Sequence, residues 1–303
     1  MADTQTRRIF LNRRTLFILA LVAIWSVAAV ADTEKAKEHY NKGVTAMKDG
    51  DTDAAIIAFK AAVNQDANYA DAYLNLGVIY FQGKEYDQAL EMFETATEKD
   101  NQNVDAYSNL GRVNVVLRKY TEAEAAFQSA IAIAGDNSEL HKELGKVYYR
   151  QKNYAALITT LEECHRLEGG DHLTYYMLGK AYHRQDDSRS GIAALTRSIE
   201  LKKENYNAHF LLGTIYLGQE KFRQAASEFR AAEGVDAKRA YKAAYNYAVA
   251  MQSDNPDAYD ANIANWERFI SLGKKNPKAK SDVAMAEDLV KELKEAKAEA
   301  DLQ

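Results

Sequence analysis

Six glycines recur in this chain at a constant interval of 34 residues. They are Gly43, Gly77, Gly111, Gly145, Gly179 and Gly213, with no insertion or deletion between them. Each lies inside an apolar and otherwise helical pattern, as in the stretch YLNLGVIYFQGKEYDQALEMF from Tyr73 to Phe93. A glycine in a helix interior costs about 1 kcal/mol relative to alanine. A structural requirement that repeats along the chain must therefore favour glycine at this position.

Other residue types keep the same register. A ring stands four positions before each glycine, at His39, Tyr73, Tyr107, His141, Tyr175 and His209. A large apolar side chain stands sixteen positions after it, at Phe59, Phe93, Phe127, Leu161, Leu195 and Phe229. A small residue stands nineteen positions after it, at Ala62, Ala96, Ala130, Cys164, Ser198 and Ala232. A period of this length indicates similar units that stack side by side and share a continuous core.

The composition indicates that these units are helical. The whole chain contains only two prolines, Pro256 and Pro277, and it is rich in good helix formers. Each period accommodates two antiparallel helices of about 13 residues. We expect the glycine of the first helix and the small residues of the second to let the two helices approach closely, while the large side chains fill the surrounding space.

This pattern resembles the tetratricopeptide repeat (TPR) family over residues 36–239. The resemblance implies an all-α, right-handed α-solenoid of antiparallel helix pairs. Repeats are expected to start near residues 36, 70, 104, 138, 172 and 206, with a degenerate seventh repeat near residue 240. The proline that closes each repeat in the family is absent here. We expect the glycines of AGDN and EGGD to end their helices in the left-handed conformation instead.

The two ends of the chain have different roles. Residues 32–273 are assigned to the solenoid, and residues 274–303 to a capping helix with an apolar stripe at Val283, Ala286, Leu289, Val290 and Leu293. Residues 1–31 combine four arginines, an apolar run and an A-x-A site, which is typical of a secretory signal peptide. An uncleaved membrane anchor is the alternative for the same segment. Both predict export, to the periplasm or to an inner-membrane-anchored position facing it.

The resemblance further implies that the first helix of each repeat lines a concave groove. In the third to fifth repeats, the groove positions gather cations and rings: Arg112, Lys142, Lys146, Tyr149, Arg150, Tyr176, Lys180, His183 and Arg184. The groove positions on either side are apolar, at Tyr40, Met47, Leu74 and Phe81 and at Phe210 and Leu217. Because the chain as a whole has a net charge of −5, a basic groove suggests a site for an acidic peptide or a C-terminal carboxylate. The alternative is that these long side chains only cover an exposed helix face.

The remaining residues favour a non-catalytic protein. A single cysteine, Cys164, excludes an internal disulfide framework, and the spacing of the histidines predicts no metal site. No phosphate-binding loop or nucleophile motif is present, so we expect no cofactor. The acidic balance argues against nucleic acid, and contact with a membrane is expected only through residues 1–31. We therefore predict a protein-binding scaffold or adaptor of the cell envelope. A periplasmic assembly factor or chaperone-like protein for envelope or pilus components is the alternative.

Overall fold

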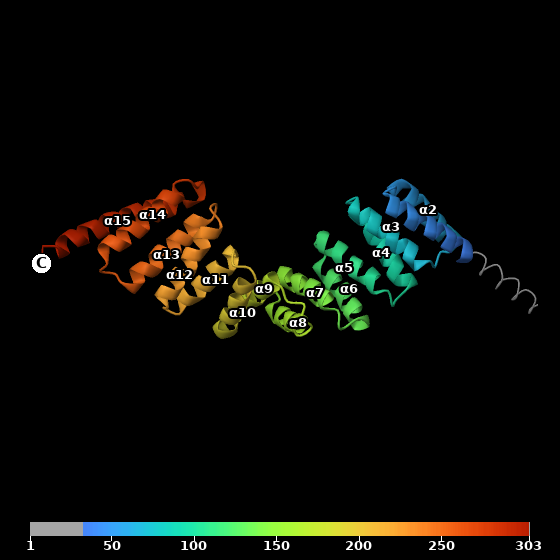
Figure 1. Cartoon of the computed structure of the whole chain (residues 1–303), viewed down its shortest axis with the longest axis horizontal. Coiled ribbons are helices and arrows are strands. Elements are labelled where there is room, and N and C mark those ends of the chain that lie inside the picture. Colours follow the sequence, from blue (N-terminus) through green and yellow to red (C-terminus); the bar gives the residue numbers. More distant parts are fainter. Residues whose placement is uncertain (1–32, 303) are drawn as a thin grey trace, which may run out of the picture. The chain divides into compact units, whose positions relative to one another are not determined.

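The computed structural model describes residues 33–302, and these residues form helices joined by short turns, with no strand among them (Figure 1). The chain divides into two compact units between Gly135 and Asp136. Each unit is an α-solenoid in which successive helices pack against one another in antiparallel pairs. The predicted signal peptide or anchor lies outside the described residues. Within them, no helix has both the length and the apolar character needed to span a bilayer.

The first unit comprises the helical residues 33–49 and five further helices. These are α2 (Thr52–Gln65), α3 (Ala70–Gln82), α4 (Tyr86–Lys99), α5 (Val104–Val116) and α6 (Tyr120–Ile133). Helix α3 packs against α4 and α5 against α6, and α4 joins the two pairs by packing against α5. The core of the unit includes the buried side chains of Phe59, Leu76, Phe93 and Val113.

The second unit contains four helix pairs and a final helix. They are α7 (Ser138–Gln151), α8 (Tyr154–Arg166), α9 (His172–Arg184), α10 (Ser188–Leu201), α11 (Tyr206–Gly218), α12 (Phe222–Val235), α13 (Ala240–Asp254), α14 (Tyr259–Gly273), the short 3-10 helix η1 (Pro277–Ala279) and α15 (Lys280–Ala300). Each helix from α7 to α15 packs against the next helix in the chain. Helix α15 buries Val283, Ala286, Val290 and Leu293 against the last helix pair and exposes its charged face, as a capping helix requires.

The recurring glycines are explained by the large side chain sixteen residues later. A Cβ atom added to any of the six would come closer than 3.0 Å to that side chain. The pairs are Gly43 with Phe59, Gly77 with Phe93, Gly111 with Phe127, Gly145 with Leu161, Gly179 with Leu195 and Gly213 with Phe229. The close approach of the two helices agrees with the prediction from the sequence. The predicted place of the large side chains, around this contact, was wrong, because they lie directly on the glycine.

A left-handed backbone conformation also recurs every 34 residues, and it is visible only in the structure. In each of the first six repeats, the turn between the two helices contains one residue with a positive φ angle, between 59° and 77°. These residues are Gly50, Lys84, Arg118, Lys152, Asp186 and Glu220. Only the first is glycine, although the left-handed conformation is unfavourable for other residue types. The turn geometry is therefore imposed by the packing of the helix pair, and the sequence does not reveal it.

The turns that close the repeats differ from the prediction. In EGGD the left-handed residue is Glu168, with φ of 59°, and neither Gly169 nor Gly170 has a positive φ. In AGDN the helix ends at Ala134 with φ of −128°, and Gly135 does not adopt the left-handed conformation. Gly169 is instead required for space, because a Cβ there would collide with Ser138 and approach the sulfur of Cys164.

Candidate partner-binding wall of helices α7 and α9

Eight of the nine predicted site residues lie on two neighbouring helices of the second unit, α7 and α9. Helix α7 carries Lys142, Lys146, Tyr149 and Arg150, and α9 carries Tyr176, Lys180, His183 and Arg184. We call these eight residues the α7–α9 wall. The ninth residue, Arg112, lies on α5 in the first unit, where its side chain is exposed. The site described below consists of the residues of the second unit.

Helical spacing aligns the wall residues along each helix. Lys142, Lys146 and Arg150 follow one another at intervals of four residues, and so do Tyr176, Lys180 and Arg184. Residues four apart lie on the same face of an α-helix. Each helix therefore presents a row of three side chains that ends in an arginine near the C-terminus of the helix.

Lys180 and Tyr149 connect the two helices. The Lys180 ammonium donates a hydrogen bond of 2.7 Å to the Tyr149 hydroxyl and lies 4.7 Å from the centre of the Tyr149 ring. Tyr176 lies beside the same hydroxyl. Its burial, followed by the hydroxyl of Tyr149, raises the pKa of Tyr176 to about 12. The bond between Lys180 and Tyr149 links the two rows of side chains across the helix pair.

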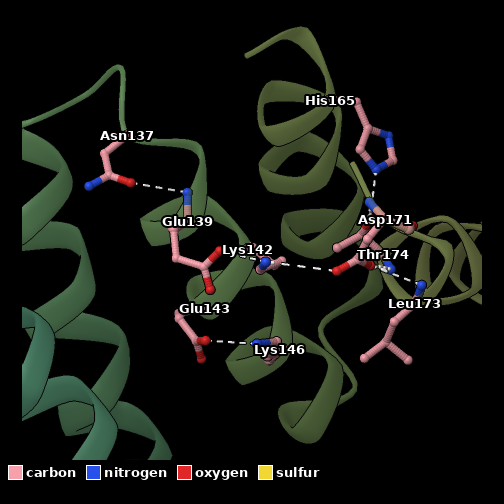
Figure 2. A network of polar contacts seen from close by, with 9 residues as sticks. All are labelled: Asn137, Glu139, Lys142, Glu143, Lys146, His165, Asp171, Leu173 and Thr174. Carbon is pink, nitrogen blue, oxygen red and sulfur yellow. Dashed lines mark hydrogen bonds and ion pairs between the residues drawn. The ribbon is translucent and has the colours of Figure 1, made fainter. Parts of the chain in front are cut away.

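Two of the predicted cations are already neutralised within the protein. Lys142 lies 2.5 Å from a carboxylate oxygen of Glu139 and 3.8 Å from one of Asp171, and Lys146 lies 2.7 Å from Glu143 (Figure 2). The hydrogen bond that Lys142 donates to Glu139 outweighs the effect of burial and raises the pKa of Lys142. These ion pairs reduce the free positive charge of the wall below what the basic residues alone predicted.

The acidic partners were missed in the sequence analysis, although a signal for them was present. Glu139 and Glu143 each precede their lysine by three residues, a spacing at which helical side chains meet. Asp171 follows α8 and belongs to a polar network around the start of α9. Only the folded chain brings it to Lys142, because 29 residues separate the two in sequence.

The network at the start of α9 holds this end of the wall in place, as Figure 2 shows. Asp171 accepts hydrogen bonds from the backbone N–H groups of Leu173 and Thr174, and the Thr174 hydroxyl lies 3.1 Å from Nε2 of His165. Burial opposes ionisation of Asp171, but the N–H of Thr174 and the charge of Lys142 outweigh it and lower the pKa. Burial also lowers the pKa of His165, whose ring stacks on Tyr175 at 3.9 Å. Asp171 is thus a charged N-cap, and His165 a neutral packing group.

The free positive charge of the wall lies at the C-terminal ends of α7 and α9. Arg150 and Arg184 are exposed, and neither has an ion-pair partner among residues 33–302. The partner of Lys180 is a hydroxyl rather than a carboxylate, so Lys180 is not part of an ion pair among the described residues. The three cations, together with Tyr149, Tyr176 and His183, can bind a carboxylate and pack against an apolar side chain beside it.

The other groups that might carry chemistry are structural. Cys164 is buried, and burial raises the pKa of its thiol, so it is not a reactive thiolate. His141 is buried in the ring position of its repeat, and His209 pairs with Glu228. Within the part of the chain that the structure describes, no three His, Cys, Asp or Glu side chains gather in an arrangement that could hold a metal ion.

The fold and this wall define a helical-repeat protein whose helix pairs expose side chains for contact with another molecule. Family models for the tetratricopeptide repeat match residues 46–112 and, separately, residues 109–156 and 176–232. The chain belongs to the tetratricopeptide repeat family, as the 34-residue register predicted. Among curated proteins, the comparison finds no match.

Several solved structures have the same fold. The C-terminal part of a TPR repeat-containing protein from Cytophaga hutchinsonii matches with a TM-score of 0.65 and 19% identity, covering 80% of this chain and 98% of that one. MamA matches with a TM-score of 0.52 and 24% identity over 56% of this chain and 93% of its own. YrrB, described as a TPR protein with an unusual peptide-binding site, matches with a TM-score of 0.53 and 19% identity. The match covers 59% of this chain and 91% of that one. At these identities the likeness concerns the fold.

Proposed function

We propose that this protein is a non-catalytic scaffold that binds an acidic segment of a partner protein on the α7–α9 wall. The observation that carries the proposal is the row of unpaired cations on the two helices. Lys180 bonds to Tyr149, and Arg150 and Arg184 have no ion-pair partner among the residues that the structure describes. A carboxylate placed between two arginines forms charge-assisted hydrogen bonds, and the tyrosine rings supply apolar contact beside it. The description of YrrB as a peptide-binding TPR protein supports a peptide as the ligand.

The basic wall is a local feature of an acidic protein. The chain has 44 acidic and 39 basic residues, so a cluster of unpaired cations is not its average surface. An acidic partner would be repelled by the surface as a whole and attracted at the wall. Such a charge pattern favours one docking position over others.

We further propose that the protein acts outside the cytoplasm, in the cell envelope. The support is the sequence of residues 1–31, with its arginines, apolar run and A-x-A site. N-terminal sequencing of the protein isolated from its native cells would test export. Cleavage after Ala31 supports a free periplasmic protein, and an intact N-terminus in the membrane fraction supports an anchor.

Site-specific photo-crosslinking in cells tests the binding wall. A photoreactive phenylalanine replaces His183 in one variant and Thr196, an exposed residue on α10, in the control. We expect one or a few proteins to crosslink through position 183 and not through position 196. Combining the position-183 probe with Arg150→Glu and Arg184→Glu should abolish these products. Unchanged crosslinking with the charge-reversed wall would refute the proposal.

The same experiment separates the scaffold from the alternative of a chaperone-like assembly factor. A scaffold gives the same few partners in growing and stressed cells. A chaperone gives many unfolded clients, which would contact apolar groove positions. In the first unit these positions, including Leu74 and Phe81, are partly buried against the core. This packing favours the scaffold.

A further inference from the structure

The second unit contains a hollow that is lined by aromatic side chains. None of its lining residues belongs to the α7–α9 wall. It lies where α11, α13 and α14 meet η1 and the start of α15, and its volume is about 360 Å³. It is lined by four rings, those of Phe210, Tyr241, Tyr245 and Phe269, and by the polar side chain of Asn246. Tyr241 and Phe269 are buried, so the rings that a ligand can reach are mainly those of Phe210 and Tyr245. We call it the aromatic hollow.

The walls of the aromatic hollow are held in place by ring packing. Tyr245 contacts Phe269 edge-on, with 5.2 Å between ring centres, and Trp266 at 5.4 Å. Phe210 stacks on Tyr206 at 5.6 Å. Edge-on and offset-stacked pairs are the arrangements that aromatic rings prefer. The hollow is therefore formed before any ligand arrives, so a ligand does not need to order its walls.

The rim of the hollow is charged and open. Lys242 on α13 and Lys278 in η1 carry ammonium groups, and Asp282 on α15 carries a carboxylate. All three side chains are exposed, and none forms an ion pair with another residue of the described chain. Two cations against one anion give the rim a net positive charge in a chain whose total charge is −5.

We propose that the aromatic hollow binds an internal segment of a partner protein in which a large apolar side chain stands next to an aspartate or glutamate. The apolar side chain packs against the accessible faces of Phe210 and Tyr245, and the carboxylate pairs with Lys242 and Lys278. Asp282 can accept a hydrogen bond from a backbone N–H of the same segment. The volume lies at the small end of the range for ligand pockets, roughly 300–1,000 Å³, which suits one large side chain. This site shares no residue with the α7–α9 wall.

Selection from a library of short random peptides tests the inference. The peptides are displayed within a loop, so that they have no free carboxyl terminus, and they are selected on the immobilised full chain. We expect enrichment of sequences with a large apolar residue next to Asp or Glu. Enriched peptides are then synthesised with both ends blocked, and their affinity is measured by fluorescence anisotropy.

Two pairs of substitutions serve as test and matched control. Lys242→Glu with Lys278→Glu reverses the rim, and should weaken the enriched peptides by at least about fivefold, since each exposed ion pair contributes a fraction of a kcal/mol and reversal adds repulsion. Lys275→Glu with Lys280→Glu makes the same change of charge at exposed positions outside the lining, and should bind as wild type. Replacing the apolar residue of the peptide by alanine should weaken binding to a similar extent.

Three results would overturn the inference. They are the absence of enrichment, equal affinity for the rim-reversed and wild-type chains, and an affinity that does not change when the apolar residue of the peptide is replaced by alanine. The Arg150→Glu and Arg184→Glu variant should bind these peptides as wild type. This variant therefore distinguishes a failure of the proposal for the aromatic hollow from a failure of the proposal for the α7–α9 wall.

Discussion

Gly77 and Phe93 meet so closely that no side chain fits between them. A Cβ at Gly77 would lie 2.5 Å from the Phe93 ring, which is fully buried. The same contact recurs in the other repeats with phenylalanine or leucine. In each of these repeats one large apolar side chain packs directly against the backbone of the glycine, and this contact offsets the poor helix propensity of glycine.

Gly77→Ala should therefore destabilise the protein despite its better helix propensity. Overpacking costs about 1–3 kcal/mol and the gain in propensity returns about 1, so we expect a net loss of about 1 kcal/mol or more. Gly234→Ala is the control, because this glycine also lies inside a helix but a Cβ there would meet nothing within 4 Å. That variant should be stabilised by about 0.5–1 kcal/mol. Urea unfolding measures the change in stability of both variants. Equal changes for Gly77→Ala and Gly234→Ala would contradict the role of the contact between Gly77 and Phe93.

The left-handed turn residues offer sites for stabilisation. Lys84 and Lys152 have φ angles of 64° and 60° and are exposed. Replacing either with glycine should raise the free energy of unfolding by about 0.5–1 kcal/mol, because glycine adopts this conformation without steric cost. Lys84→Ala keeps the strain and is expected to change stability little. Thermal unfolding of the three variants measures these changes in stability. If alanine stabilised the protein as much as glycine, the left-handed conformation would not be the cause.

His209 should make the second unit more stable in mild acid. Its Nδ1 lies 2.7 Å from a carboxylate oxygen of Glu228 and its Nε2 lies 3.0 Å from the carbonyl of Lys203. The hydrogen bond to Glu228 raises the pKa of His209 above its ordinary value of 6.5. A raised pKa means that the folded state favours the charged ring. The stabilisation is complete below the ordinary value and is lost as the pH rises through the raised one.

The measurement compares wild type with His209→Tyr, which places at this position the ring that three other repeats have. Between about pH 5.5 and about pH 8, wild type should lose about 1 kcal/mol of stability relative to the variant. The comparison is needed because burial lowers the pKa of His165, which changes stability in the opposite direction. Glu228→Gln should also remove the dependence. Parallel pH profiles for wild type and both variants would rule out this assignment.

Replacing Glu233 should destabilise the protein less than replacing its ion-pair partner Arg268. This buried carboxylate on α12 lies 2.5 Å from Arg268 on α14 and 3.4 Å from Arg230. Glu233→Gln leaves two arginines that are partly exposed and can be hydrated, so we expect a loss of about 1 kcal/mol. Arg268→Met leaves a buried charge short of its nearest partner and should cost about 2 kcal/mol. Chemical denaturation gives the order, and Arg197→Met, which breaks an exposed pair with Glu200, should have little effect.

The constant period made most of the fold predictable. Residues in one register meet the same neighbours in every repeat, so the glycines, the rings and the small residues predicted helix pairs from the sequence alone. The apolar stripe of α15 predicted its packing for the same reason, because helical periodicity places Val283, Ala286, Val290 and Leu293 on one face.

The candidate site was only partly predictable. The sequence placed Lys142, Lys146, Lys180 and the arginines on the first helices of their repeats, and the structure brings those of α7 and α9 together. It did not show that Lys142 and Lys146 are neutralised. The pairing with Glu143 could have been read from the spacing of three residues, whereas the contact with Asp171 could not.

What the sequence determined by itself is the repeat: its length, its helical character and the residues that share a register. These properties depend on local spacing and on composition, which act within one helix or between neighbouring helices. Only the tertiary structure decided which side chain covers each glycine, which turn residues are left-handed, which cations remain unpaired and where the aromatic hollow lies. Those outcomes depend on distances of a few ångströms between groups far apart in the chain, and such distances are set by packing rather than by residue type.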